Sequence, residues 1–298
     1  MDGGIGIGDD CAVVEIPRGD QTLVTTDFSL ENIHFRRAWH PADSVGHRCL
    51  ARGLSDIAAM GGVPRAVFLS LALPPRLPQS WVDGFLRGFL KLAERFKVGL
   101  AGGDTAQSPG QVLADIMVLG SIPRGNAVLR SGARPGDRIY VTGELGGSAA
   151  TFKMLWHGKK AKSRNFPRHF YPVPRVEVGT FLREKRLASA MIDISDGLST
   201  DLGHICEESG VGAEVEEASI PLATVGKREV DLAVALHGGE DYELLFTVPR
   251  GKRVPSRIAG VALRQIGTVT RGRKVFLVDR AGGKHELAAQ GWEHFRQT

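Results

Sequence analysis

Residues 6–14 read GIGDDCAVV, in which glycines precede two adjacent acids and an apolar run follows them. Further acids stand beside apolar segments in the stretches TTD, LSD, GGDT and DISD: Asp27, Asp56, Asp104, Asp193 and Asp196. We expect nearly all of these aspartates to lie where an apolar element meets a turn, because side chains at such positions can converge on one cleft. Together with Asp10, these carboxylates would repel one another strongly unless cations lay between them.

Converging acids favour hard divalent cations, and Mg²⁺ suits a site in which phosphate oxygens complete the octahedron. A single Asp beside Gly more often caps the backbone of a turn, so the prediction depends on the whole set. The chain lacks the Walker pattern, the protein-kinase signatures and the G-x-S-x-G motif. If ATP is bound, we therefore expect carboxylate-bound metal and glycine turns to hold it.

The composition is that of an ordinary globular protein, with 298 residues of which 42% are hydrophobic and 24% charged. The net charge of +5 suits small anionic ligands and falls short of a nucleic-acid-binding signature. Cys11, Cys49 and Cys206 lie far apart, so we expect no disulfide framework, no zinc site and a cytoplasmic location. No apolar stretch approaches the ~20 residues that span a bilayer, so no membrane contact is expected.

Hydrophobic periodicity predicts a mixed α+β fold, because strands and helices alternate without the strict rhythm of a doubly wound sheet. In the first half we expect helices at 43–60 and 80–96, and strands at 21–28, 66–73, 98–105 and 112–122. The strand at 98–105 is expected to run into a Gly-Gly-Asp turn. In the second half we expect helices at 146–156, 196–209 and 229–236, strands at 190–195, 212–217 and 241–248, and a basic, solvated loop at 157–175. A turn near Arg134 predicts domains at 1–133 and 134–298.

Seven stretches, in this order, closely resemble the thiamine-monophosphate kinase family of the aminoimidazole ribonucleotide synthetase superfamily: GIGDDCAVV, TTDFSLENIHF, LSDIAAMGG, GGDT, RSGARPGDRIYVTGELGGSAA, IDISDGLSTDLGHI and GGEDYELLFTV. The resemblance runs from about Gly6 to the C-terminus. It implies transfer of the ATP γ-phosphoryl group to thiamine monophosphate, with several Mg²⁺ ions and a homodimer. It also implies that residues 1–133 bind Mg²⁺ and ATP and dimerise, while 134–298 complete the ATP and substrate sites.

The resemblance also implies roles for individual residues. The implied metal set is Asp10, Thr25, Thr26, Asp27, Asp56, Asp104, Asp193 and Asp196. Within it, the acids implied to carry the catalysis are Asp56, Asp104 and Asp193. The implied ATP-binding residues are Gly103, Asp104, Arg130 and Ser195. The implied substrate-binding residues are His34, Glu240 and Trp292, of which a lone His and a terminal Trp would otherwise be read as structural.

The chemistry of the reaction agrees with these roles. The acceptor is a phosphate oxygen that is already anionic at neutral pH, so no strong general base is needed. The main difficulty is to bring two anions together, which bridging metal ions overcome. Arg130 can offer a bidentate fork to phosphate, and Glu240 can accept a hydrogen bond from the aminopyrimidine or face the cationic thiazolium. We expect direct in-line transfer without a phosphoenzyme.

The sequence departs from the family in two places. Only five residues precede Gly6, where the family has an amphipathic helix, so we expect a shortened N-terminus. Gly53 stands where the family has Asn, which indicates either close packing or a weakened helix beside Asp56. Two alternatives stay open. One is another ATP-using superfamily member, similar to selenophosphate synthetase or to the hydrogenase-maturation protein, which needs a reactive Cys or selenocysteine; the other is a catalytically silent nucleotide-binding protein.

Overall fold

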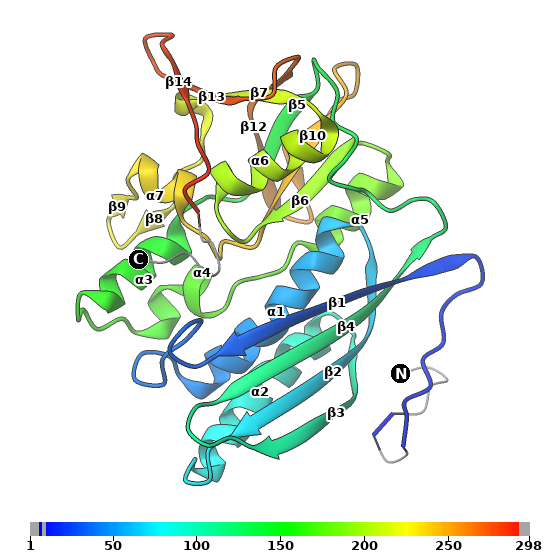
Figure 1. Cartoon of the computed structure of the whole chain (residues 1–298), viewed down its shortest axis with the longest axis vertical. Helices are drawn as coiled ribbons and strands as arrows, with labels where there is room; N and C mark the ends of the chain where they lie inside the picture. Colours follow the sequence, from blue (N-terminus) through cyan, green and yellow to red (C-terminus); the bar gives the residue numbers. More distant parts are fainter. Residues whose placement is uncertain (1–5, 8–9, 292–298) are drawn as a thin grey trace. The chain divides into compact units, whose positions relative to one another are not determined.

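The computed structural model describes residues 6–7 and 10–291 of the chain, and it divides into two compact units (Figure 1). Unit 1 holds the described residues up to Ile57, together with Gly62–Asn126 and Lys160–Pro174. Unit 2 holds Ala58–Gly61, Ala127–Lys159 and the described residues from Arg175 onward. Both units combine sheets with helices, so the predicted mixed α+β fold is confirmed.

Unit 1 is built on a four-stranded sheet in the order β1-β4-β2-β3. Its strands are β1 (Asp20–Leu30), β2 (Val63–Leu73), β3 (Gly99–Gln107) and β4 (Leu113–Pro123). Strand β4 is antiparallel to both β1 and β2, whereas β2 and β3 are parallel. Its long helices are α1 (Ala42–Ala59) and α2 (Gln79–Arg95). These strands and helices were all predicted from the sequence, although several of the strands are longer than expected.

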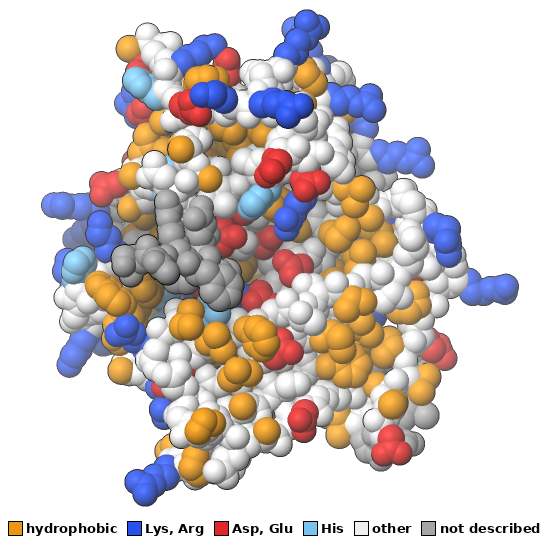
Figure 2. Space-filling view, viewed as in Figure 1, with side chains coloured by type: hydrophobic (Ala, Val, Ile, Leu, Met, Phe, Trp, Pro, Cys, Tyr) orange, Lys and Arg blue, Asp and Glu red, His pale blue; other side chains and the backbone are white. Residues whose placement is uncertain are grey.

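The two faces of this sheet differ because side chains alternate along each strand. Val67, Ile116 and Val118 are fully buried on the face that α1 covers. On the opposite face, the side chains of Val24 and Phe28 are 60% and 53% exposed. Figure 2 shows hydrophobic side chains gathered on the surface over this sheet. Unit 1 therefore presents an apolar sheet face to its surroundings.

Close packing explains why Gly53 is in helix α1. A Cβ atom at this position would lie 2.6 Å from Cγ2 of Val118 and 2.7 Å from Cδ1 of Ile116, both on β4. These contacts are shorter than real Cβ atoms make, so the helix can approach the sheet this closely only with glycine here. Of the two readings that the sequence left open, the structure supports close packing.

The predicted Gly-Gly-Asp turn is wrong, because Gly103 and Asp104 lie inside strand β3. They pair with Leu69 and Ser70 of β2, and the strand continues to Gln107. A Cβ at Gly103 would lie 1.9 Å from the carbonyl oxygen of Leu69. The glycine is needed for this close approach between strands, which the sequence pattern did not distinguish from a turn.

The stretch 157–175 is more structured than the solvated loop that we expected. It contains the short helices η1 (Ser163–Asn165) and α4 (Pro167–Phe170), and the side chains of His169 and Phe170 are buried. Within unit 1, Nε2 of His169 lies 3.0 Å from Nε2 of His40. The Tyr171 hydroxyl donates a hydrogen bond to Asp43 at 3.0 Å. Hydrophobic periodicity did not predict this packing, because the buried side chains of His169 and Phe170 do not recur at helical or strand spacing.

Unit 2 is built on a larger sheet in the order β14-β13-β7-β12-β5-β10-β6, with β11 paired to β12. Its strands are β5 (Arg138–Thr142), β6 (Ala190–Ile194), β7 (Gly212–Glu216), β10 (Glu243–Val248), β11 (Arg257–Ile258), β12 (Val261–Thr270), β13 (Val275–Val278) and β14 (Lys284–Glu286). A separate hairpin pairs β8 (Thr224–Val225) with β9 (Arg228–Glu229). Its helices are α3 (Gly147–Trp156), α5 (Val176–Glu184), α6 (Leu198–Ser209), η2 (Glu217–Ser219) and α7 (Leu232–His237).

The core of unit 2 lies between this sheet and its helices. Ile139 of β5, Ile192 of β6 and Leu245 of β10 come from neighbouring strands, and Leu202 and Ile205 of α6 belong to the same buried cluster. The packing of α6 against β6 orients the turn between them. That turn carries the predicted residues Ser195 and Asp196.

We predict that Gly53→Ala lowers the free energy of unfolding by up to about 2 kcal/mol, because a gain of about 1 kcal/mol in helix propensity offsets only part of an overpacking cost of about 1–3 kcal/mol. Gly203→Ala in α6 is the matched control, since a Cβ there meets nothing within 4 Å. The control should stabilise the protein by about 0.5–1 kcal/mol. Urea unfolding of both variants measures the difference. Equal stabilisation by the two alanines would contradict the packing explanation.

Candidate functional site

Helix α1 and strand β1 bring three of the predicted metal-binding residues together in unit 1. The Thr25 hydroxyl donates a hydrogen bond to the Asp56 carboxylate, and Arg52 Nη1 lies 3.4 Å from Asp27 Oδ1. Residues two apart on a strand and four apart on a helix share a face, so the pairs Thr25–Asp56 and Asp27–Arg52 stand side by side. Arg52 is only 7% exposed and also donates to the carbonyl of Phe28 at 3.2 Å.

Other members of the predicted metal set in unit 1 lie elsewhere. Thr26 falls between Thr25 and Asp27, so its side chain is on the opposite face of β1. Asp104 pairs with Ser70 of β2, and Ser70 pairs with Asp115 of β4. Asp115 in turn pairs with exposed Phe28 of β1, so Asp104 and Phe28 are on the same face of the sheet. The Asp104 carboxylate accepts the backbone N–H of Thr105 at 2.8 Å. Asp104 therefore does not share a sheet face with Asp27. Asp10 lies in the N-terminal segment and is exposed.

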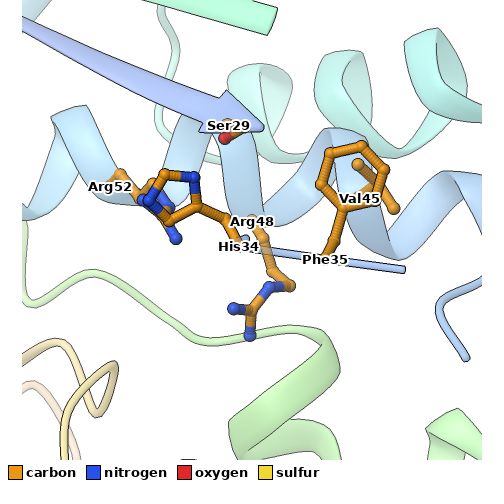
Figure 3. Close-up of a pocket in the computed structure, with 6 residues that line it drawn as sticks. All are labelled: Ser29, His34, Phe35, Val45, Arg48 and Arg52. Carbon is orange, nitrogen blue, oxygen red and sulfur yellow. The ribbon is translucent and has the colours of Figure 1, made fainter. Parts of the chain in front are cut away.

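A small pocket in unit 1 contains the predicted substrate residue His34 (Figure 3). Its lining residues are Ser29, His34, Phe35, Val45, Arg48 and Arg52. His34 Nδ1 accepts the backbone N–H of Leu30 at 3.0 Å. The neutral ring therefore carries its proton on Nε2, which is a hydrogen-bond donor.

Sequence reasoning missed the two arginines of this pocket. Arg48, Arg52 and Asp56 are spaced four residues apart, so they lie along one face of α1. Arg48 donates to the carbonyl of His169, and both guanidinium groups are buried. The signal available in the sequence was the presence of two arginines at helical spacing before the predicted metal ligand Asp56. They make the electrostatic potential of the pocket positive, which suits an anionic group.

In unit 2, the turn between β6 and α6 holds Ser195 and Asp196 in place. The backbone N–H groups of Ser195, Asp196 and Gly197 all donate to Oδ2 of Asp201, at 3.1, 3.1 and 3.0 Å. Asp201 is 1% exposed, and Asp193 is also buried on β6. Burial, with the charges of Asp193 and Asp196, raises the pKa of the Asp201 carboxyl to about 8 against the opposing backbone hydrogen bonds. Asp201 was not among the predicted site residues.

The segment that carries Glu240 runs beside this turn. The N–H of Glu240 donates to the Ser195 carbonyl at 2.8 Å, and the N–H of Tyr242 donates to that of Ile194 at 2.9 Å. Glu240 and Tyr242 have φ angles of 64° and 51°, which are uncommon for non-glycine residues. Between them, Asp241 accepts the N–H of Gly146 at 2.6 Å. These contacts bring the predicted residues Glu240 and Ser195 together.

Arg130 stands apart from this arrangement. The Arg130 carbonyl accepts the hydroxyl of Ser209 at 3.0 Å, at the end of α6 opposite Ser195, roughly 18 Å away along the helix. Trp292 lies outside the described residues. Its neighbour Gly291 donates its N–H to Thr200 Oγ1 at 3.0 Å, and a Cβ at Gly291 would lie 2.0 Å from the Asp196 carbonyl oxygen.

A buried ion pair supports the same part of unit 2. Arg175 donates through Nε to Glu243 Oε2 at 2.7 Å and through Nη2 to Oε1, and the Thr142 hydroxyl donates to Oε2 at 2.5 Å. Burial of Arg175 opposes its charge, but the hydrogen bonds and charge of Glu243 outweigh this effect and raise the guanidinium pKa. Glu243 follows the Glu240 segment directly, so the pair secures the start of β10.

The oxygen donors named above are divided between the two units. Across residues 6–7 and 10–291, no three His, Cys, Asp or Glu side chains are arranged to hold a metal ion by themselves. A cation in unit 1 would therefore need hydroxyl, water or phosphate oxygens beside Asp27 and Asp56. In the part of the chain that the structure describes, no helix has the length and apolar character needed to cross a membrane.

Comparisons with known proteins give consistent results over nearly the whole chain. The family model of the AIR synthase related protein N-terminal domain matches residues 8–122, and that of the C-terminal domain matches 134–280. The thiamine-monophosphate kinase of Escherichia coli (strain K12) is 39% identical over 99% of this chain and 93% of its own.

Two solved structures have the same fold. The crystal structure of thiamine-monophosphate kinase from Stenotrophomonas maltophilia has a TM-score of 0.84 and 33% identity, over 93% of this chain and 91% of that one. A structure described as AaThiL complexed with AMPPCP and TMP has a TM-score of 0.82 and 34% identity, over 97% and 92%.

We predict that Glu243→Gln lowers the free energy of unfolding by about 3 kcal/mol, because it leaves the buried guanidinium of Arg175 without its counter-charge. Glu286→Gln is the control, since Glu286 pairs with Lys274 at 2.6 Å on the surface, where both side chains are exposed. The control should cost less than about 1 kcal/mol. Chemical denaturation measures the free energy of unfolding of both variants. A similar loss of stability in the two would show that burial does not increase the contribution of the Arg175–Glu243 pair.

Proposed function

Because the chain belongs to the thiamine-monophosphate kinase family of AIR synthase related proteins, we propose that it phosphorylates thiamine monophosphate with ATP. The observation that carries this proposal is 39% identity to the Escherichia coli kinase over 99% of the chain. In the reaction, a phosphate oxygen of the acceptor forms a bond to the γ-phosphorus. The bond from that phosphorus to the β–γ bridging oxygen breaks, and ADP leaves as thiamine diphosphate forms.

We propose Mg²⁺ as the metal, because the donors are hard oxygens. Asp27, Asp56 and Thr25 would hold it in unit 1, and Asp193 and Asp196 would do so in unit 2. Asp193 and Asp196 lie close enough to Asp201 for their charges to raise its pKa, so a cation beside them would relieve repulsion between acids. Bound Mg²⁺ would neutralise and bridge phosphate oxygens as the two anions approach. The other ligands that the resemblance implies, Asp10, Thr26 and Asp104, stay predictions.

The chain's own groups then bind and orient the two substrates. The Nε2–H of His34 can donate to the substrate, while buried Arg48 and Arg52 give its pocket a positive potential. The Glu240 carboxylate can accept from the aminopyrimidine, and Ser195 can donate to ATP phosphates. Arg130, at the opposite end of α6 from Ser195, stays a prediction as an ATP contact. Trp292 as a ring-stacking group and Gly103 as an ATP contact stay predictions. No protein nucleophile is required, so transfer is direct.

The cysteines do not favour the alternatives that depend on a reactive thiol. Burial raises the pKa of the Cys49 thiol to about 12 and that of Cys206 to about 11, so both stay protonated at neutral pH. Cys11 is exposed, but it stands between the Asp-Asp pair and an apolar run. All three cysteines are free, which agrees with the reducing cytoplasm that we propose as the location.

We also propose that the protein is a homodimer that pairs through the open face of the unit 1 sheet. Exposed Val24 and Phe28 lie on that face, with Met117 on β4 in register with Thr26 beside them. An apolar sheet face of this kind is a ready interface between copies. Its position on unit 1 agrees with the dimerisation role expected for residues 1–133.

We predict that Phe28→Asp halves the mass of the particle in solution, because the new carboxylate would have to be desolvated in the interface and would stand opposite Asp115, the cross-strand partner of residue 28. Trp156→Asp is the control, since Trp156 is 57% exposed on α3 of unit 2. Light scattering after size exclusion measures both. A monomeric wild type, or a Phe28→Asp dimer, would contradict the proposed interface.

The proposed reaction is tested by incubation with ATP, Mg²⁺ and thiamine monophosphate, followed by chromatography for thiamine diphosphate. We predict that Asp56→Asn, which keeps the shape and removes the charge, lowers kcat by about 100-fold or more. Asp83→Asn is the control, because Asp83 lies on exposed α2 and accepts from Gln79 at 3.0 Å. Near wild-type turnover by Asp56→Asn would contradict its role as a metal ligand, and no thiamine diphosphate from the wild type would contradict the function.

A further inference from the structure

Asp201 makes an unusual set of hydrogen bonds for a buried acid. A single oxygen, Oδ2, accepts the N–H groups of three successive residues, Ser195, Asp196 and Gly197, at 3.0–3.1 Å. Successive backbone N–H groups that point inward form a concave site for an anion. Here the anion is a side chain of the same protein, four residues into helix α6. The turn is therefore closed around Asp201.

Folding alone does not account for a carboxylate at this position. Asp201 is buried beside two other acids, Asp193 and Asp196, so its charge is unfavourable for both desolvation and repulsion. What the carboxyl group supplies is hydrogen-bond acceptance for the N–H groups of the turn that precedes α6, of which only Gly197 is the N-cap of the helix. These hydrogen bonds hold the three residues of the turn, of which Asp196 is proposed to bind metal and Ser195 to bind ATP.

The same turn is contacted from two further directions. The Glu240 N–H donates to the Ser195 carbonyl at 2.8 Å, so the turn also fixes a proposed substrate contact. Gly291 packs against the Asp196 carbonyl, and its N–H donates to Thr200, next to Asp201. A displacement of the turn would therefore move groups proposed for the metal, the nucleotide and the acceptor together.

We propose that Asp201 is a positioning residue for phosphoryl transfer, which acts as a hydrogen-bond acceptor that holds Ser195 and Asp196 in their working conformation. The inference depends on the proposed function for the roles of those two residues. Asp201 itself does not need to touch a substrate. The role depends on the position of Oδ2 of Asp201 and not on the charge of the carboxyl group, because three backbone N–H groups donate to that one oxygen.

The test compares three substitutions at this position. Asp201→Asn keeps an oxygen that can accept the three N–H groups, whereas Asp201→Ala removes it and Asp201→Glu moves the carboxylate by one methylene. We expect kcat to fall about 10–100-fold in Asp201→Ala and Asp201→Glu, the usual effect of losing a group that orients a ligand. The Mg²⁺ concentration for half-maximal activity should rise in both. Asp201→Asn should stay within about threefold of wild type in both quantities.

Asp137→Asn and Asp137→Ala are the matched controls. Asp137 is also buried, and its Oδ2 accepts the N–H of Arg134 at 3.1 Å and the hydroxyl of Ser189 at 2.6 Å, at the opposite end of β6. Asp137→Ala should lower Tm about as much as Asp201→Ala, but kcat and the Mg²⁺ dependence should not change. Equal Tm losses with unchanged kcat at both positions would make Asp201 merely structural. An Asp201→Asn variant as inactive as Asp201→Ala would show that its charge acts directly.

Amide hydrogen exchange separates this inference from the proposed function. The N–H groups of residues 195–197 should exchange at least tenfold faster in Asp201→Ala than in wild type or Asp137→Ala, whatever reaction the protein catalyses. If Asp201→Ala does not fold, Asp201→Glu supplies the same comparison. Unchanged exchange would overturn the positioning role even in an active enzyme. Faster exchange in a wild type that forms no thiamine diphosphate would leave the contact valid and the function wrong.

Discussion

Acids that lie close together repel one another unless hydrogen-bond donors or cations satisfy them, and this constraint shapes both candidate sites. In unit 1, a hydroxyl holds Asp56 and a buried guanidinium holds Asp27. In unit 2, three backbone N–H groups hold Asp201 beside Asp193 and Asp196. Donors satisfy part of Asp27 and Asp56, and their remaining oxygens are the places where a divalent cation would complete the balance. Much of the surrounding fold serves to put these donors in position.

Helices α1 and α6 supply this support in two different ways. Along α1, residues four apart present Arg48, Arg52 and Asp56 on one face, so its side chains reach β1 and the His34 pocket. At α6, the unpaired N–H groups at the start of the helix become donors to one of its own side chains. The first arrangement depends on how closely a helix approaches a sheet, which is why Gly53 cannot carry a Cβ without strain. The second depends only on the local turn.

The strands of unit 1 differ from the sequence-based expectation at one turn, and the structure separates some residues that the resemblance grouped. A Gly-Gly-Asp stretch is compatible with a turn, but here Gly103 allows β3 to pass close to Leu69 within the sheet. Asp27 and Asp104 both occur in polar, glycine- or threonine-rich stretches, yet the register places them on opposite faces of the sheet. A shift of one residue in register exchanges the two faces, and nothing in a single sequence determines that register. The resemblance implied that Arg130 and Ser195 both bind ATP, but in the structure the two residues lie at opposite ends of α6.

The sequence by itself determined the mixed α+β fold, most of the helices and strands, and the family, because these depend on local periodicity and on motifs that are continuous in the chain. Through the resemblance it also placed Thr25, Asp27 and Asp56 in one metal set. Only the tertiary structure decided which acids share a face, that Arg48 and Arg52 line the His34 pocket, and that Asp201 closes the turn at Ser195. Those relations depend on strand register, on helix approach and on burial, which arise from contacts between residues far apart in sequence and leave no local pattern.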